Sequence, residues 1–210
     1  MMSKKEIYFI MAIIAISALL IIFTNQITLR EFPNSADEYA YLIMAETFSQ
    51  GELSVPSPLE SKFFDFFHII NDGKFYGKYP IGWPLFLTFG VLIKLPMAIN
   101  LIFGILALIL IFLTAKEISS TKTANITLLI ASTSPYFIFN SASYFSHSSA
   151  LFFSVLSFFI YIKNLRSSKI SNFFLLGMTL GILFNIRPLD SIIILFCLLM
   201  HYLYTVYPHD

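Results

Sequence analysis

Six long apolar runs dominate this sequence of 210 residues. They occupy Ile7–Phe23, Met97–Ala115, Thr123–Ser143, Ser148–Ile162, Ser171–Ile186 and Ser191–Tyr207. An apolar helix of ~20 residues crosses the ~30 Å hydrocarbon core of a bilayer, and shorter or longer helices adapt by tilting or kinking. We therefore expect an all-α polytopic membrane protein with about six transmembrane helices.

The composition agrees with a membrane protein. Only 12% of the residues are charged, against about 25% in an ordinary soluble domain. The net charge of +1 gives no indication of nucleic-acid binding, so we expect membrane lipid as a partner and no nucleic acid. The single cysteine, Cys197, lies in an apolar run, which excludes a disulfide framework and a metal–thiolate site.

The first run predicts an uncleaved anchor helix over residues 7–23. Lys4 and Lys5 precede it, and no small-residue cleavage site follows it. The polar segment 24–96 comes next and contains most of the acidic residues of the chain. We expect it to form a large extracytoplasmic loop with short interfacial helices, followed by a five-helix bundle over 97–207, within a single membrane domain over 1–210.

The number of spans depends on whether the apolar stretch Ile81–Leu95 crosses the membrane. If it crossed the membrane, the basic residues between the later runs would all lie outside. If it does not cross, they join Lys4 and Lys5 on the cytoplasmic side, as the positive-inside rule requires. We therefore predict that Ile81–Leu95 lies in the outer interface, with Trp83 at the level of the lipid headgroups. The result is a multi-pass protein of the cell membrane with both termini cytoplasmic.

The start of the polar segment predicts a helix. Ser35-x-x-Glu38 is a capping box, in which Ser35 accepts from a first-turn N–H and the Glu38 carboxylate reaches back to the cap. The helix would begin at Ala36, and Gly51 is suited to end it in a left-handed conformation.

Asp37 lies on the apolar face of this predicted helix. It shares that face with Tyr41, Met44, Ala45 and Phe48, at helical spacing. A carboxylate on an apolar face points toward the membrane or the protein, which favours a functional site. The alternative is that Asp37 only complements the helix dipole in the first turn.

Two further polar residues lie between the later runs, on the predicted outer side. Arg187 precedes Pro188 in a tight turn, where a guanidinium can hold a phosphate in a fork of hydrogen bonds. Its alternatives are a local pair with Asp190, three positions on, or snorkelling toward the interface. His147 is either a residue at a helix end or a ligand or base.

The stretch from Asn71 to Pro84 predicts a turn at Asp72-Gly73, in a hairpin that includes Phe75 and Tyr76. Lys78 follows, between aromatic residues. It is either a point charge for a lipid phosphate or an anchor to anionic headgroups.

The order of these motifs resembles a known family. The acidic pair Asp37-Glu38 follows the anchor helix, and Tyr76-Gly77-Lys78-Tyr79-Pro80-x-Gly82-Trp83-Pro84 follows the pair. Further matching positions are Gly51-Glu52-Leu53, Asn100, Ser134-Pro135 and Arg187-Pro188. The chain is thus similar to the N-terminal part of the multispanning GT-C glycosyltransferases, the group of the protein O-mannosyltransferases and aminoarabinose transferases.

The resemblance implies a function in glycosylation of the cell envelope. A sugar would pass, with inversion, from a polyprenyl-phosphate donor to an acceptor at the outer face of the membrane. Asp37 maps onto the catalytic or metal-associated carboxylate, and we take its neighbour Glu38 with it as catalytic. Lys78 maps onto the lysine that contacts the donor phosphate. We add Tyr79, His147 and Arg187 as substrate-binding candidates.

The chain departs from the family in three ways. Gly77 stands where aminoarabinose transferases have an acidic residue, and His147 stands where many relatives have Asp. A divalent metal ion is therefore left open, and no cofactor is certain. Relatives also continue with more spans, so the resemblance implies an incomplete module that needs a C-terminal membrane segment or a partner subunit.

The rival hypothesis is a non-catalytic membrane protein: a transporter half, an assembly partner or an inactive remnant.

Overall fold

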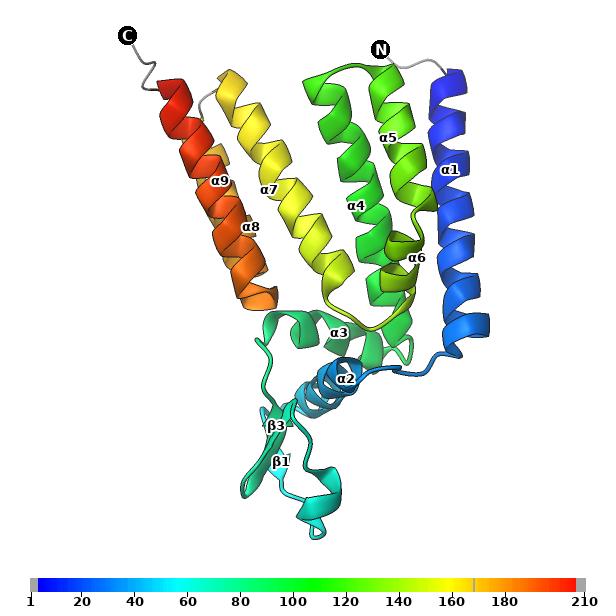
Figure 1. Cartoon of the computed structure of the whole chain (residues 1–210), viewed down its shortest axis with the longest axis vertical. Coiled ribbons are helices and arrows are strands. Elements are labelled where there is room, and N and C mark those ends of the chain that lie inside the picture. The colour runs from blue at the N-terminus through cyan, green and yellow to red at the C-terminus, as the bar shows by residue number, and fades with distance from the viewer. Residues whose placement is uncertain (1–3, 168, 207–210) are drawn as a thin grey trace.

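The computed structural model describes residues 4–167 and 169–206 and is mostly helical (Figure 1). Its longer helices are α1 (Lys4–Phe23), α2 (Ala36–Ser49), α3 (Gly82–Leu92), α4 (Pro96–Ile118), α5 (Thr121–Thr133), α6 (Pro135–Ala142), α7 (His147–Ser167), α8 (Ile170–Ile186) and α9 (Pro188–Val206). A π-helical turn, η1 (Thr24–Leu29), extends α1, and a short 3-10 turn, η2 (Ser61–Phe64), lies between the first two strands. The predicted end of the last span, Tyr207, lies outside the described residues.

Four of the described helices are long and apolar enough to cross a membrane. They are α1 with its extension (Lys4–Leu29), α4, the His147–Arg166 part of α7 and the Pro188–Thr205 part of α9. Helices α3 and α8 are apolar but shorter. By length and composition, the chain is therefore an integral multi-pass membrane protein.

One predicted helix boundary is confirmed and one was wrong. The anchor helix ends at Phe23 as predicted, and the π-helical turn η1 continues it to Leu29, with the buried Asn25 donating to the Ala142 carbonyl at 2.7 Å. The run Thr123–Ser143 forms two helices rather than one. Pro135 has no N–H and forces the preceding residue out of the helical region, so Ser134 is extended (φ −64°, ψ 121°) and caps α6.

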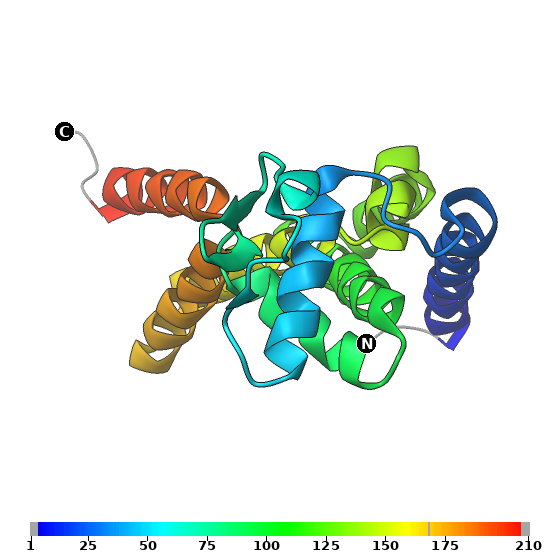
Figure 2. The ribbon, with the colours of Figure 1, turned by 90° about the horizontal axis from the view of Figure 1, so that it is seen from below.

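The long helices lie side by side, and the segment between α1 and α4 lies at one end of them (Figure 1). Seen along the helices, α2 and the sheet lie across the helix ends (Figure 2). Helix α3 contacts α2, α4 and α8, which joins this segment to the bundle. The start of α1 and the end of α9 lie at the opposite end (Figure 1).

The segment contains a small antiparallel sheet of β1 (Val55–Pro56), β2 (Ile69–Asn71) and β3 (Lys74–Gly77), in the order β1-β3-β2. The predicted hairpin at Asp72-Gly73 is confirmed, with Gly73 at a φ of 69°. The predicted start of α2 at Ala36 and the left-handed Gly51 after its end, with a φ of 81°, are also confirmed.

Trp83 is in the protein core. We expected it among lipid headgroups, but its side chain is 0% exposed and its Nε1 donates to the Tyr144 carbonyl at 2.8 Å. The surrounding core draws Tyr41 from α2, Phe103 from α4 and Leu183 from α8. The tryptophan therefore fixes α3 to the bundle, because burial satisfies both its apolar ring and its N–H.

Asn100 fixes the connection between α6 and α7. Its side chain is 0% exposed, and its amide nitrogen donates to the carbonyls of Asn140, Ser143 and Phe145. This connection carries Tyr144, and His147 follows it as the first residue of α7. Both residues are thereby held close to the start of α2.

Candidate functional site

A cluster of three polar side chains lies at the start of α2; we call Asp37, His68 and Tyr79 the Asp37 cluster. The Tyr79 hydroxyl donates to Asp37 Oδ1 in a short hydrogen bond. His68 Nδ1 lies 3.2 Å from the same carboxylate oxygen and 2.7 Å from Tyr79 Oη. The Asp37 side chain is 38% exposed and that of His68 27%, so a substrate can reach both.

The β2–β3 hairpin brings two members of the cluster to Asp37. The Lys78 N–H donates to the His68 carbonyl at 3.0 Å, which continues the ladder one step beyond β2 and β3. The His68 and Tyr79 rings are stacked, with centroids 5.6 Å apart and planes at 13°. On its other side, Tyr79 packs against Tyr41 of α2, with ring centroids 4.5 Å apart.

Gly77 lets β3 lie close to α2. A Cβ atom at this position would lie 2.5 Å from Met44 Sδ. A larger side chain at this position has no room without movement of Met44.

The Tyr79 hydroxyl remains protonated. Burial, the hydrogen bond to Asp37 and the charge of Asp37 all raise the pKa of Tyr79 well above its usual value of 10.0. A phenol with a raised pKa is a donor throughout the physiological range, and this stabilises the Asp37 carboxylate as acceptor.

Tyr41 links the cluster electrostatically to Arg187. Burial raises the pKa of Tyr41, the hydrogen bond to Ser146 lowers it, Asp37 raises it, and the positive charge of Arg187 lowers it. Asp37 and Arg187 therefore both act on the same hydroxyl.

Glu38 has a structural role. It is 1% exposed, and Oε2 accepts from the Asn34 N–H at 2.8 Å and from Ser35 Oγ at 3.3 Å. Oε1 accepts from the Tyr144 N–H at 2.8 Å. The capping-box prediction is thus confirmed, with Asn34 rather than Ser35 as the backbone donor. Of the acidic pair, only Asp37 has a carboxylate that a substrate can reach.

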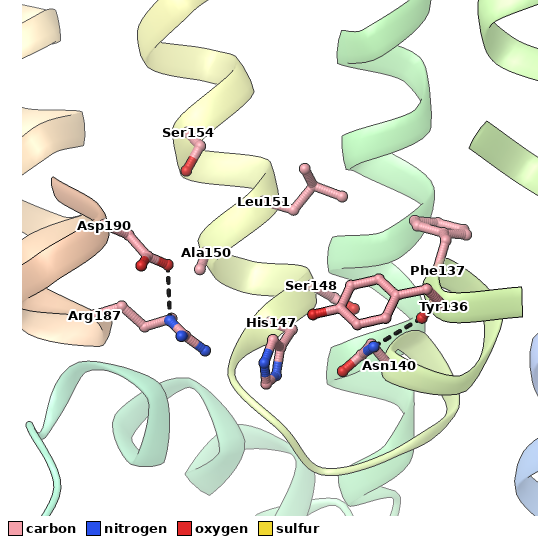
Figure 3. Close-up of a pocket in the computed structure, with 10 residues that line it drawn as sticks. All are labelled: Tyr136, Phe137, Asn140, His147, Ser148, Ala150, Leu151, Ser154, Arg187 and Asp190. Carbon is pink, nitrogen blue, oxygen red and sulfur yellow. Dashed lines mark hydrogen bonds and ion pairs between the residues drawn. The ribbon is translucent and has the colours of Figure 1, made fainter. Parts of the chain in front are cut away.

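Arg187 and His147 line a cavity of about 320 Å³ between α6, α7 and the start of α9 (Figure 3). Arg187 Nε lies 2.7 Å from Asp190 Oδ2, so the local ion pair is present. Figure 3 shows the terminal nitrogens of the guanidinium turned away from Asp190 and toward His147. His147 Nδ1 is buried and has no hydrogen-bond partner among the described residues.

Lys78 lines a different cavity. Its ammonium group lies over the Phe67 ring, 4.8 Å from the centroid. With Tyr79, Lys74 and Tyr76 it borders a cavity of about 500 Å³. The predicted substrate-binding residues are thus divided between two cavities: Lys78 and Tyr79 line one, and Arg187 and His147 line the other.

The described residues do not fit a protein-bound metal ion of the usual kind. Within 4–167 and 169–206, no three His, Cys, Asp or Glu side chains lie close enough to share one ion. Asp37 and His68 form only a pair, and catalytic metal sites generally use three protein ligands. We therefore derive no step through a metal.

His68 was not among the site residues predicted from the sequence. No motif surrounds it, and its partner Asp37 is 31 positions away. The hairpin register indicates its position. In the structure Ile69 lies opposite Gly77, so the next pair outward is His68 and Lys78. This places His68 beside Tyr79, a residue that the motifs had already singled out.

Comparisons of the chain with protein-family models, with curated proteins and with solved structures found no significant match. The resemblance of the motifs to GT-C glycosyltransferases therefore stays a prediction, and the functional argument depends on the geometry of the Asp37 cluster.

Proposed function

We propose that the protein is a glycosyltransferase of GT-C type, which passes a sugar from a polyprenyl-phosphate donor to an acceptor hydroxyl. One observation carries the proposal. The Asp37 carboxylate is exposed to substrate while Oδ1 is held by Tyr79 and His68, and in the described ranges no hydrogen bond to Oδ2 is found. A held carboxylate with one open oxygen is suited to general-base chemistry.

The reaction is a single displacement. Asp37 Oδ2 takes the proton of the acceptor hydroxyl as its oxygen forms a bond to the anomeric carbon. The bond from that carbon to the phosphate oxygen breaks, and the polyprenyl phosphate leaves with the electron pair. Because the protein contributes no nucleophile, the configuration at the anomeric carbon is inverted.

Two cations are candidates for binding the leaving phosphate. Arg187 has terminal nitrogens turned away from its ion pair with Asp190 (Figure 3). Lys78 precedes Tyr79 and lines a separate cavity. A fixed cation stabilises charge that develops on the leaving group without reorganisation during the reaction. The cation that binds the phosphate determines the side from which the acceptor hydroxyl approaches the sugar.

The proposed reaction needs a polar site at the outer end of the spans. The basic residues Lys4, Lys5, Lys116, Lys122, Lys163, Arg166 and Lys169 lie at the helix ends opposite the segment that contains the Asp37 cluster (Figure 1). By the positive-inside rule, that basic end is cytoplasmic. We propose six crossings, with α5 and α6 together as one and α8 as another, and both termini in the cytoplasm.

The experiment supplies membranes carrying the chain with a labelled polyprenyl-phosphate sugar and a hydroxyl acceptor. We expect labelled product whose anomeric configuration, read by NMR, is inverted relative to the donor. Membranes without the chain are the control. If the purified chain neither binds the donor nor transfers the sugar, the non-catalytic alternative replaces the proposal.

A further inference from the structure

The geometry points to His68 as a positioning residue that, through its Nδ1–H, holds Oδ1 of Asp37 and leaves Oδ2 as the oxygen that takes the proton. This inference rests on the proposed function and deepens it. Nothing in the motifs indicates such a role for His68, which lies outside all of them. Asp37 Oδ1, Tyr79 Oη and His68 Nδ1 lie close together, and the number of hydrogens that they can donate decides which atom carries a proton.

The hydrogen bonds of the cluster fix the position of the proton on His68. An ionised Asp37 can only accept, and Tyr79 has one O–H, which it donates to Asp37 Oδ1. The contact of 2.7 Å between Tyr79 Oη and His68 Nδ1 then needs a hydrogen on the nitrogen. Asp37 Oδ1 lies 3.2 Å from the same nitrogen. His68 therefore carries a proton on Nδ1, which bonds to the phenol oxygen and lies next to the carboxylate.

The surroundings hold the imidazole ring in this orientation. One face stacks on Tyr79, and Phe67 meets the ring at 90° with centroids 5.1 Å apart. The His68 backbone carbonyl accepts from the Lys78 N–H in the continued ladder. The ammonium group of Lys78 lies over Phe67. The ring is thus fixed by stacking and by the backbone before any substrate binds.

Holding one carboxylate oxygen has a catalytic consequence. A carboxylate that rotates about its Cβ–Cγ bond presents either oxygen to the acceptor and loses orientation with each turn. With Oδ1 bound by the Tyr79 hydroxyl and His68 Nδ1 lying 3.2 Å from it, Oδ2 keeps one direction. A misplacement of about 1 Å in a catalytic group can cost roughly 10²-fold in rate, so loss of the histidine donor should lower kcat more than substrate binding.

Two substitutions test the role. His68→Ala removes the donor, and we expect kcat for sugar transfer to fall by up to about 10²-fold with KM for the donor nearly unchanged. His68→Asn places an amide N–H near the position of Nδ1, and we expect it to recover most of the rate. If His68→Ala transfers at the parental kcat, or if His68→Asn is as slow as His68→Ala, the inference is wrong.

The chain contains a matched control. Tyr161 Oη and His201 Nδ1 form the same kind of pair, 2.7 Å apart, between α7 and α9. His201→Ala removes an equivalent tyrosine–histidine bond far along the helices from Asp37. We expect His201→Ala to leave kcat at the parental value, so that an equal loss in both variants would count against a specific role for His68.

A spectroscopic measurement tests the hydrogen bond without any transfer reaction. The chain has four histidines, so 15N-labelled histidine in the parent and in His68→Asn assigns the His68 signals by difference. We expect a protonated Nδ1 in the parent; a neutral ring with its proton on Nε2 would overturn the inference. If the parent chain transfers no sugar, the proposed function fails by itself, and this measurement still decides whether His68 holds Asp37.

Discussion

Two adjacent carboxylates, Asp37 and Glu38, have different roles because their surroundings differ. Glu38 points into the bundle, where it accepts hydrogen bonds from the N–H groups of Asn34 and Tyr144. Asp37 lies one residue earlier and meets side chains from the hairpin. Glu38 links α2 to the connection before α7, and Asp37 keeps a partly exposed carboxylate.

Glu38→Gln should destabilise the fold. Glutamine has one acceptor oxygen, so one of the buried N–H donors loses its partner, and such a loss costs about 1–3 kcal/mol. We expect a lower thermal midpoint for the detergent-solubilised protein. Glu46→Gln, an exposed change on the same helix, is the control. Equal midpoints for the two variants would show that Glu38 does not fix α2 to the bundle.

Arg187→Lys should weaken donor binding. Lysine keeps the charge but loses the planar set of donors that binds a phosphate through two parallel hydrogen bonds. One charge-assisted hydrogen bond is worth about 1.5–3 kcal/mol, which is roughly tenfold or more in Kd. Titration of the purified protein with a polyprenyl-phosphate sugar measures the change.

Asp190→Asn separates the two interpretations of Arg187. It removes the ion pair at Nε and leaves the guanidinium in place. If the arginine binds the phosphate, Asp190→Asn should bind the donor at least as tightly as the parent. Weaker binding in this variant, with Arg187→Lys unchanged, would mean that the arginine serves only its local ion pair.

At the residue level, the sequence predicted contacts between near neighbours. Ser35 and Glu38 are three positions apart, and the Asp72-Gly73 turn depends on its own backbone, so both were predictable. Trp83 was not, because its partner Tyr144 is 61 positions away. An amphipathic aromatic ring suits a lipid interface and a protein core equally well, and only the tertiary contacts decide between them.

At the element level, the contact between α3 and α8 places the start of α3 beside Arg187. A Cβ atom on Gly82 would lie 2.5 Å from the Asn185 carbonyl oxygen. The neighbour is backbone and cannot turn aside as a flexible side chain can. Gly82 therefore sets the distance between the segment that carries the Asp37 cluster and the α8–α9 turn.

Gly82→Ala should destabilise the protein by about 1–3 kcal/mol, as overpacking of a tight contact commonly does. Gly177→Ala is the matched control on α8, since a Cβ there meets nothing within 4 Å and alanine favours a helix over glycine by up to about 1 kcal/mol. Thermal midpoints in detergent compare the two. A Gly82→Ala variant as stable as Gly177→Ala would contradict the close contact.

The observed helix boundaries include features that hydropathy alone does not predict. Each apolar run is helical, because the backbone must bond internally in lipid, but the run Thr123–Ser143 is divided into α5 and α6. The break at Pro135 was visible in the sequence, yet an apolar run on both sides of it gave no reason to divide the span. Similarly, nothing local indicated that Asn25 would find an acceptor at Ala142, 117 positions away, and extend α1.

At the scale of the whole molecule, we propose that the Asp37 cluster lies on the outer side of the cell membrane. In a Cys197→Ala background, Leu59→Cys should react with an impermeant thiol reagent in intact cells, because Leu59 is fully exposed in the segment between α2 and α3. Ser119→Cys, in the α4–α5 turn, should react only after permeabilisation. Labelling of Ser119→Cys in intact cells, with protection of Leu59→Cys, would reverse the proposed orientation.

The most direct measurement of the central claim is the transfer rate of Asp37→Asn in membranes, with protein level and thermal midpoint checked alongside. Asn keeps the shape of the side chain and removes the base, so transfer should fall by roughly 10²–10⁴-fold. The loss of a first-turn carboxylate should cost only about 0.3–1 kcal/mol of stability. Asp72→Asn, an exposed change in the hairpin turn, should transfer at the parental rate. If Asp37→Asn also transfers at the parental rate, Asp37 only complements the dipole of α2, and the proposed mechanism is wrong.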